Sequence, residues 1–180
     1  IEVKSDILAS NDLDEHLIAS LKQQGARIGV WGVGTKLVTA YDEPALGGVY
    51  KLGATRAPGE AWRPVLKLSE HAAKISTPGV LQVRRFTRAG QFLGDMICAD
   101  AAPADASRTI VDPHDPTRRK TFSADAIAED LLVPVLRGGR PVAEDPPLPA
   151  IRARVQAQLA ALHPSLKRLV HPHEYPVGLE

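Results

Sequence analysis

A segment with helical spacing lies between two short apolar runs, and this alternation limits the possible folds more than any other feature of the sequence. We predict strands at residues 2–10 and 26–31. Apolar side chains between them recur on one helical face, at Leu13, Leu17, Ile18 and Leu21. Gly25 stands where a glycine commonly ends a helix. The short loops make this a strand–helix–strand unit, with parallel strands and a right-handed crossover.

Acidic residues mark the start of the predicted helix. We predict Asp12 as its N-cap residue, with Glu15 at the N3 position of a capping box. The N-cap role explains Asp12 fully, and a role in ligand binding is the alternative for this residue.

A glycine-rich turn, Gly32-Val33-Gly34-Thr35, follows the second strand. Two glycines one residue apart let the backbone approach a ligand and can turn several N–H groups the same way, which favours an anion. A short helix that starts at Thr35 or Lys36 would direct its positive end to the same place. The unit brings this turn and Asn11-Asp12 to the carboxyl ends of neighbouring parallel strands, where α/β folds bind ligands. We therefore predict a phosphate site here, with an ordinary turn as the alternative.

One strand–helix–strand unit does not close a sheet. A (β/α)8 barrel needs about 250 residues and eight such units, whereas this chain of 180 residues shows one unit and part of another before the pattern changes. Two parallel strands alone would have unpaired edges. We infer that the chain is the last part of a longer protein or completes its sheet with a partner.

Beyond residue 42 the sequence is typical of short strands and turns. We predict strands at 49–52 and 63–68 and a helix at 69–75. Antiparallel hairpins follow, and we expect them at 81–87 with 92–98, at 108–111 with 120–122, and across Gly138-Gly139. A last helix is expected from Pro149, at its N1 position, to His163-Pro164.

Composition and charge argue against several kinds of site and partner. The hydrophobic fraction of 44% suffices for a core, and a net charge of +1 gives no general reason to expect nucleic acid or an anionic membrane as partner. The single cysteine, Cys98, excludes an internal disulfide, and we interpret it as a packed thiol. No apolar run approaches the roughly 20 residues of a membrane-spanning helix. We predict a soluble, cytoplasmic protein.

Neither the basic groups of the hairpins nor the histidines are assigned to a site. We interpret Arg84-Arg85-Arg88 and Arg118-Arg119-Lys120 as solvated faces or subunit contacts. His171 and His173 are two potential metal ligands, but no Cys or acidic cluster completes a site around them. We therefore predict neither a metal site nor a catalytic residue within this chain.

Four stretches of the sequence match a known family. They are ASNDLDE at 9–15, GARIGVWGVGTKLVTAYDEPALGGVYKL at 25–52, KLSEHAAKISTPG at 67–79 and, more loosely, HPHEYPVG at 171–178. With them the chain resembles the nicotinate phosphoribosyltransferase family, strongly over most of 1–98 and weakly beyond. The resemblance implies an α/β fold in which residues 1–80 are the terminal strand–helix–strand part of an irregular (β/α) barrel of the type II phosphoribosyltransferase kind. Residues 81–180 would form a β-rich C-terminal region with hairpins and one helix.

The resemblance also implies a reaction. The family joins nicotinate to phosphoribosyl pyrophosphate in NAD salvage, with ATP hydrolysis driving the step and Mg²⁺ accompanying the pyrophosphate. On this pattern Gly32, Val33, Gly34 and Thr35 would bind the ribose 5-phosphate, and Asn11 and Asp12 would approach the ribose. The family's phosphorylated histidine and its nicotinate-binding arginine belong to an upstream portion, so we expect this chain alone to be inactive. It would act with the remainder of the same enzyme, in a homodimer.

The chain departs from the family's pattern in two places. Many members have Ser-Gly-Asp where this chain has Ser10-Asn11-Asp12, and an acidic residue where it has Gly29. A side chain at Asn11 puts a backbone contact there in question, although its amide could hydrogen-bond a ribose hydroxyl. Two alternatives stay open: a related transferase for nicotinamide or quinolinate, and a non-catalytic module that binds phosphate.

Overall fold

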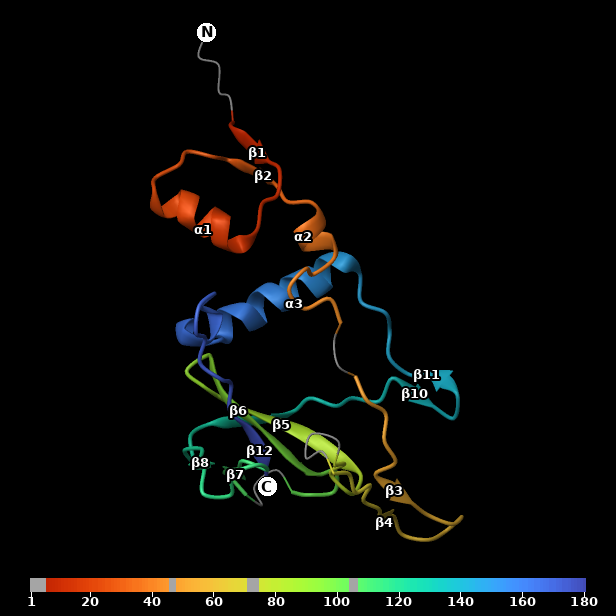
Figure 1. Ribbon diagram of the computed structural model, residues 1–180. Helices are drawn as coiled ribbons and strands as arrows, with labels where there is room; N and C mark the ends of the chain where they lie inside the picture. The colour runs from red at the N-terminus through yellow and green to blue at the C-terminus, as the bar shows by residue number, and fades with distance from the viewer. Residues whose placement is uncertain (1–5, 46–47, 71–74, 104–106) are drawn as a thin grey trace. The chain divides into compact units, whose positions relative to one another are not determined.

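A computed structural model describes residues 6–45, 48–70, 75–103 and 107–180 of the chain, which divides into two units, Ile1–Tyr50 and Lys51–Glu180. In the first unit, the strands β1 (Leu8–Ser10) and β2 (Val30–Gly32) pair in parallel, and the helix α1 (Glu15–Gln23) connects them (Figure 1). The predicted strand–helix–strand unit is therefore confirmed. Both strands are shorter than predicted over the described residues, and residues 1–5 of the first predicted strand lie outside them.

The prediction is confirmed at the C-terminal end of α1 and is wrong at its N-terminal end. Gly25, with φ 78°, follows the helix as predicted. The N-cap residue is Asp14, whose Oδ1 accepts a hydrogen bond from the Leu17 amide at 2.7 Å. The predicted capping box, with Asp12 as N-cap and Glu15 at N3, is therefore wrong. Asp12 has φ 45° and belongs to the preceding turn, whereas Asp14 has the extended backbone of an N-cap residue.

The second unit is built on a six-stranded sheet with the strand order β8-β7-β12-β6-β5-β9. Its longest strands, β5 (Leu81–Arg88) and β6 (Gln91–Ala99), form the hairpin predicted from the sequence. The two residues of the turn, Ala89 and Gly90, have φ values of 48° and 75°, as a type I′ turn requires. Side chains along β5 alternate between buried and less buried positions, so one face of the hairpin covers the core.

The other two predicted hairpins are also confirmed. The strand β7 (Thr109–Val111) pairs with β8 (Arg119–Thr121) in the large sheet. The strands β10 (Leu136–Arg137) and β11 (Arg140–Pro141) pair separately around Gly138-Gly139. Both pairs are joined by local turns, which is why their sequence signals suffice.

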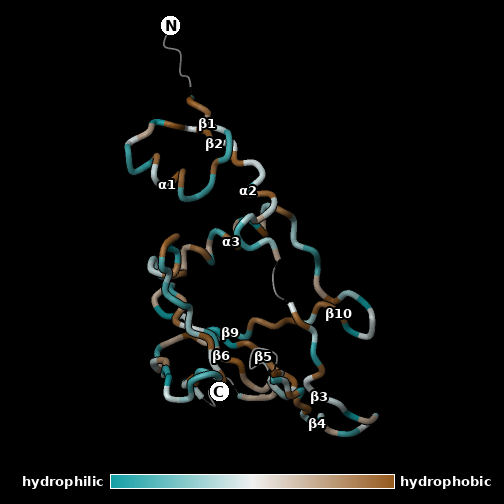
Figure 2. Tube along the Cα trace, in the orientation of Figure 1, coloured by the Kyte–Doolittle hydropathy of each residue, from teal (hydrophilic) through white to brown (hydrophobic). Residues whose placement is uncertain are grey.

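Two strands of the large sheet escaped prediction. The strand β9 (Ile127–Asp130) pairs antiparallel with β5, and β12 (Val177–Leu179) lies between β6 and β7. In Figure 1 the blue β12 runs beside the green β6, to which it is parallel. The chain that leaves β9 towards β10 is largely hydrophobic (Figure 2), and its Leu132 and Val133 are exposed.

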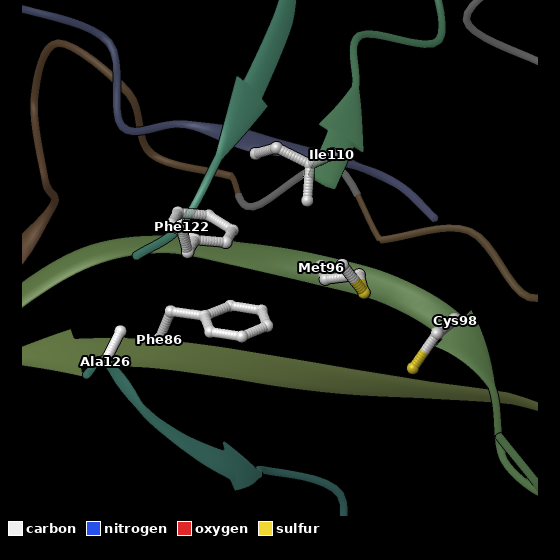
Figure 3. Packing of buried hydrophobic residues seen from close by; sticks show 6 residues of the cluster. All are labelled: Phe86, Met96, Cys98, Ile110, Phe122 and Ala126. Atoms are coloured by element: carbon white, nitrogen blue, oxygen red, sulfur yellow. The ribbon is translucent and has the colours of Figure 1, made fainter. Parts of the chain in front are cut away.

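The core of the second unit is a small cluster of apolar side chains. Its buried members are Phe86, Met96, Cys98, Ile110, Phe122 and Ala126 (Figure 3). The rings of Phe86 and Phe122 stack with their centroids 4.2 Å apart. Cys98 is 2% exposed, which confirms its interpretation as a packed thiol, and burial raises the pKa of that thiol.

The segment between the two units' main elements differs from the prediction. Residues 49–52 form no strand, and the strands present are β3 (Ala54–Thr55) and β4 (Arg63–Pro64), which pair antiparallel. The Gly53 carbonyl accepts the amides of both Val65 and Gly79, so this stretch is held by single backbone bonds instead of a longer ladder. The predicted helix at 69–75 falls largely on residues 71–74, which lie outside the described residues.

The last helix, α3 (Leu148–Ala161), begins one residue earlier than predicted, so Pro149 takes the second helical position. The helix ends before Pro164, as predicted, and Pro164 opens a short 3₁₀ turn. Its apolar residues Ile151, Val155 and Leu159 are only half covered. Within the described residues, no helix has both the length and the apolar character needed to cross a membrane.

The boundary between the units falls at residues 50 and 51. Residues 51–80 belong with the large sheet because Asp100 donates its amide to the Val80 carbonyl and Gly79 donates to Gly53. The described fold is thus an α/β first unit followed by a unit dominated by a mixed sheet. The predicted division at residue 80, and the predicted barrel, stay predictions.

Candidate functional site

The loops after β1 and β2 lie at the same edge of the first unit. The parallel register pairs Ser10 with Gly32, so the residues that follow both strands leave the sheet side by side. Asn11-Asp12 follow the first strand, and Val33-Gly34-Thr35 follow the second. The structure brings together the two loops that the sequence singled out, as the parallel topology requires. Ligand binding by these residues stays a prediction.

The first loop turns sharply at two consecutive residues. Asn11 and Asp12 have φ values of 84° and 45°, and both residues are exposed. Asn and Asp tolerate this left-handed region better than most residues, although less easily than glycine. The backbone conformation at position 11 thus suits asparagine or glycine better than most other residues.

The glycines of the second loop differ in their surroundings. A Cβ atom at Gly32 would lie 3.2 Å from the Ser10 Cβ, so a side chain there would crowd the neighbouring strand. A Cβ atom at Gly34 would meet no heavy atom of the described chain within 4 Å. The space on the Cβ side of Gly34 is therefore open within the described chain.

The helix α2 (Thr35–Val38) starts directly after Gly34, as predicted, and no side chain caps it. The first amides of a helix have no intrahelical acceptor. In the part of the chain that the structure describes, the amides of Thr35 and Lys36 donate to no other group, and the Thr35 hydroxyl also makes no hydrogen bond. These three donors lie next to one another and suit the oxygens of a phosphate.

An ion pair that the sequence did not indicate lies beside this loop. The Nζ atom of Lys36 donates to Asp14 Oδ2 at 2.6 Å. The hydrogen bond from Lys36, and next the one from the Leu17 amide, lower the pKa of the Asp14 carboxyl. The same hydrogen bond to Asp14 raises the pKa of Lys36. Only the spatial approach of α2 to the start of α1 reveals this pair, which is 22 residues apart in sequence.

A cavity of about 620 Å³ opens between α1 and α2. Its wall includes the ion pair and apolar side chains, among them Ile18, Val33 and Leu37. Among the described residues, no three His, Cys, Asp or Glu side chains form a group that could hold a metal ion.

Two of the arginines that we interpreted as solvated lie in the interior of the second unit. Arg84 is 2% exposed, forms a bidentate pair with Asp130, and donates to the carbonyls of Ala102 and Pro103. The solvated interpretation is therefore wrong for Arg84, because its guanidinium group closes a backbone turn. Arg88, in contrast, is exposed and pairs with Asp125 at 3.1 Å.

Arg85 belongs to a three-residue network with Asp95 and Tyr175. The Asp95 carboxylate accepts Arg85 Nε at 2.9 Å and Arg85 Nη2 at 2.8 Å, and the Tyr175 hydroxyl at 2.8 Å. Burial, and then the hydrogen bond to Asp95, raise the pKa of Tyr175. The network joins β5 and β6 to the segment that leads into β12.

Comparisons with known proteins agree on one family. A model of the family described as "Nicotinate phosphoribosyltransferase C-terminal domain" matches residues 82–180. The nicotinate phosphoribosyltransferase of Bacillus subtilis is 40% identical over 176 residues, which cover 96% of this chain and 36% of that protein. The human nicotinate phosphoribosyltransferase is 33% identical over 175 residues, covering 96% of this chain and 32% of that protein.

A solved structure gives the same result. The crystal structure of human nicotinic acid phosphoribosyltransferase is similar with a TM-score of 0.66 and 28% identity, over 97% of this chain and 31% of that chain. This chain thus spans about a third of the length of the relatives that it matches.

Proposed function

Because this chain belongs to the nicotinate phosphoribosyltransferase family, we propose that the protein containing it joins nicotinate to phosphoribosyl pyrophosphate and that this chain binds the ribose 5-phosphate. The products would be nicotinate mononucleotide and pyrophosphate, as a step of NAD salvage. One observation supports the phosphate site most directly. The Thr35 amide, the Lys36 amide and the Thr35 hydroxyl have no hydrogen-bond acceptor among the described residues, and they lie next to Gly34.

The chemistry of the site fits a sugar phosphate. The two amides and the Thr35 hydroxyl would donate to the phosphate oxygens, with the start of α2 adding a favourable dipole. Asn11 and Asp12, on the neighbouring loop, would reach the ribose, where the Asn11 amide can pair with a hydroxyl group. In the reaction, the pyridine nitrogen attacks the anomeric carbon and pyrophosphate leaves. This chain would hold the far end of the donor and so orient that carbon.

ATP, Mg²⁺, the homodimer and the cytoplasmic location are parts of the proposal that rest on the family likeness alone. Residues 1–80 would be the terminal part of the proposed barrel, and the remaining two thirds of the enzyme would supply the groups that bind nicotinate and pyrophosphate.

The full-length protein is expected to form nicotinate mononucleotide from nicotinate and phosphoribosyl pyrophosphate, faster with ATP than without it. Product is measured by liquid chromatography, with nicotinamide and quinolinate as competing substrates and with the 180-residue chain alone as a control that should show no turnover. Preference for either competitor would replace nicotinate in the proposal. Absence of product with all three pyridines would overturn the proposed activity.

The substitution Thr35→Val in the full-length enzyme is expected to raise the KM for phosphoribosyl pyrophosphate. The substitution removes a hydroxyl that would donate to a charged phosphate oxygen, and the binding free energy should fall by about 1.5–3 kcal/mol. Thr39→Val is the matched control, because the Thr39 hydroxyl, at the C-cap of α2, donates to the Thr35 carbonyl and to no other described residue. Initial rates at varied donor concentration measure both variants, and equal KM values for Thr35→Val and wild type would argue against Thr35 as a ligand.

A further inference from the structure

A single carboxylate connects the starts of both helices in the first unit. Asp14 Oδ1 accepts the Leu17 amide at 2.7 Å and so caps α1, while Asp14 Oδ2 accepts Lys36 Nζ at 2.6 Å. Lys36 directly follows Thr35, in the first turn of α2. The carboxylate therefore links the end of the loop at 11–14 to the end of the glycine-rich loop.

The helix α2 has few other contacts that could hold it within its unit. It has four residues, and a helix this short is not stable through its own hydrogen bonds. Thr35 is exposed, and Leu37 and Val38 are 71% and 83% exposed. Of these four residues, all of which are described, only Lys36 is half-buried. Its bond to Asp14 is therefore the main side-chain anchor of α2 in this unit.

The charge of Lys36 is already compensated. Its ammonium group lies 2.6 Å from a carboxylate oxygen and 5.6 Å from the centre of the Tyr41 ring. The mutual hydrogen bond raises the pKa of Lys36 and lowers that of Asp14, so both groups are charged at neutral pH. A paired ammonium attracts an additional anion less than a free one does, because the neighbouring carboxylate repels that anion. The geometry thus favours an indirect role for Lys36.

We propose that Asp14 and Lys36 form a positioning pair, which holds the Thr35 end of the glycine-rich loop in the geometry that binds the 5-phosphate of a phosphoribosyl compound. The pair acts through the backbone of α2 and does not contact the phosphate. This inference rests on the proposed function of the loop. A small displacement of a binding loop costs affinity because several donors lose alignment together.

A double-mutant cycle in the full-length enzyme separates this role from direct binding. Asp14→Ser removes the ion pair and keeps a good N-cap residue, and Lys36→Met removes the charge with a similar chain length. Each variant is expected to raise the KM for phosphoribosyl pyrophosphate roughly three- to tenfold, with kcat close to wild type. The double variant should be no worse than either single one. Lys36→Arg, which keeps the pair, should retain most of the affinity.

Two other outcomes would overturn the positioning role of Asp14 and Lys36. If Lys36 were a direct ligand, Lys36→Met would raise the KM for phosphoribosyl pyrophosphate much more than Asp14→Ser. The free-energy effects of the two substitutions would then add in the double variant. A purely structural pair would lower the thermal midpoint and leave the KM unchanged. Arg88→Met is the matched control, because it breaks an exposed ion pair in the other unit and should change neither quantity much.

Calorimetric titration with ribose 5-phosphate distinguishes this inference from the proposed activity. In one outcome, the wild type turns over nicotinate while both single variants bind ribose 5-phosphate with unchanged affinity. That result would overturn the positioning role of the pair and leave the proposed activity standing. Weakened ribose 5-phosphate binding in both variants, without turnover of any pyridine by the wild type, would support the pair and overturn the activity. No binding of ribose 5-phosphate by the wild type would overturn the pair together with the phosphate site.

Discussion

Deletion of residues 177–179 is expected to unfold the large sheet of the second unit. These residues form β12, which lies between β6 and β7, so its loss separates the β7–β8 hairpin from the rest of the sheet. The fit is close: a Cβ atom at Gly178 would lie 2.7 Å from the Val111 carbonyl oxygen. Removing β12 exposes the part of each neighbour that it pairs with, which is residues 95–97 of β6 and Val111 of β7. The expected loss of about 5 kcal/mol or more approaches the stability of a whole domain.

Hydrogen exchange of the full-length protein measures this prediction locally. The amides of β6 and β7 that face β12 should exchange rapidly in the deletion variant, because their pairing partners are gone. Val177→Thr is the control, since Val177 is 47% exposed and threonine suits a strand, so a change within about 0.5 kcal/mol is expected. Undiminished protection of β6 and β7 in the deletion variant would contradict the inner position of β12.

The substitution Asp95→Ala is expected to destabilise the sheet by about 3–5 kcal/mol, because it leaves a largely buried guanidinium without its partner. The Arg85 side chain is 17% exposed and that of Asp95 is 9% exposed, so water can compensate little of the loss. The Tyr175 hydroxyl loses its acceptor at the same time. Chemical denaturation, followed through exchange of the β5 and β6 amides, measures the change.

The exposed pair Arg88–Asp125 provides the matched control for Asp95→Ala. Its side chains are 56% and 64% exposed, so Asp125→Ala should cost less than about 1 kcal/mol. Tyr175→Phe removes a single hydrogen bond from the network and should fall between the two, at about 1 kcal/mol. Similar losses for Asp95→Ala and Asp125→Ala would mean that the network is not buried in solution.

The elements that the sequence predicts correctly are those with local signals. The β5–β6 hairpin needs only alternation and a turn with glycine at its second position, and Ala89-Gly90 supply the positive φ values. The strand–helix–strand unit needs only apolar spacing, and its topology then places two loops at one edge. The place of the candidate site, at the carboxyl ends of β1 and β2, was therefore predictable from the sequence.

The features that escaped prediction depend on distant partners. The strand β12 has only three residues and takes its conformation from β6 and β7. The choice between Asp12 and Asp14 as N-cap depended on how long the preceding turn continues at positive φ. The Asp14–Lys36 pair depends on how α2 approaches α1, which spacing along the chain does not show.

The register of the β5–β6 hairpin shows the same limit in detail. The turn pairs Arg88 with Gln91, yet an irregularity between Phe86 and Thr87 shifts the later pairs by one residue. This bulge brings Arg85 directly opposite Asp95. A regular hairpin would have paired Arg85 with Gly94, so the buried network could not be inferred from the sequence pattern.

The inner position of β12 has a consequence for synthesis in the cell. Residue 177 pairs with residue 95, so roughly 80 residues must leave the ribosome between the two partners, which takes about 4–16 s at 5–20 residues per second. During that interval β6 presents an unpaired edge beside Met96, a side chain that is fully buried in the finished sheet. Such an edge readily pairs with other nascent chains. We expect recovery of native protein to depend on chaperones that cover this edge until translation has passed β12.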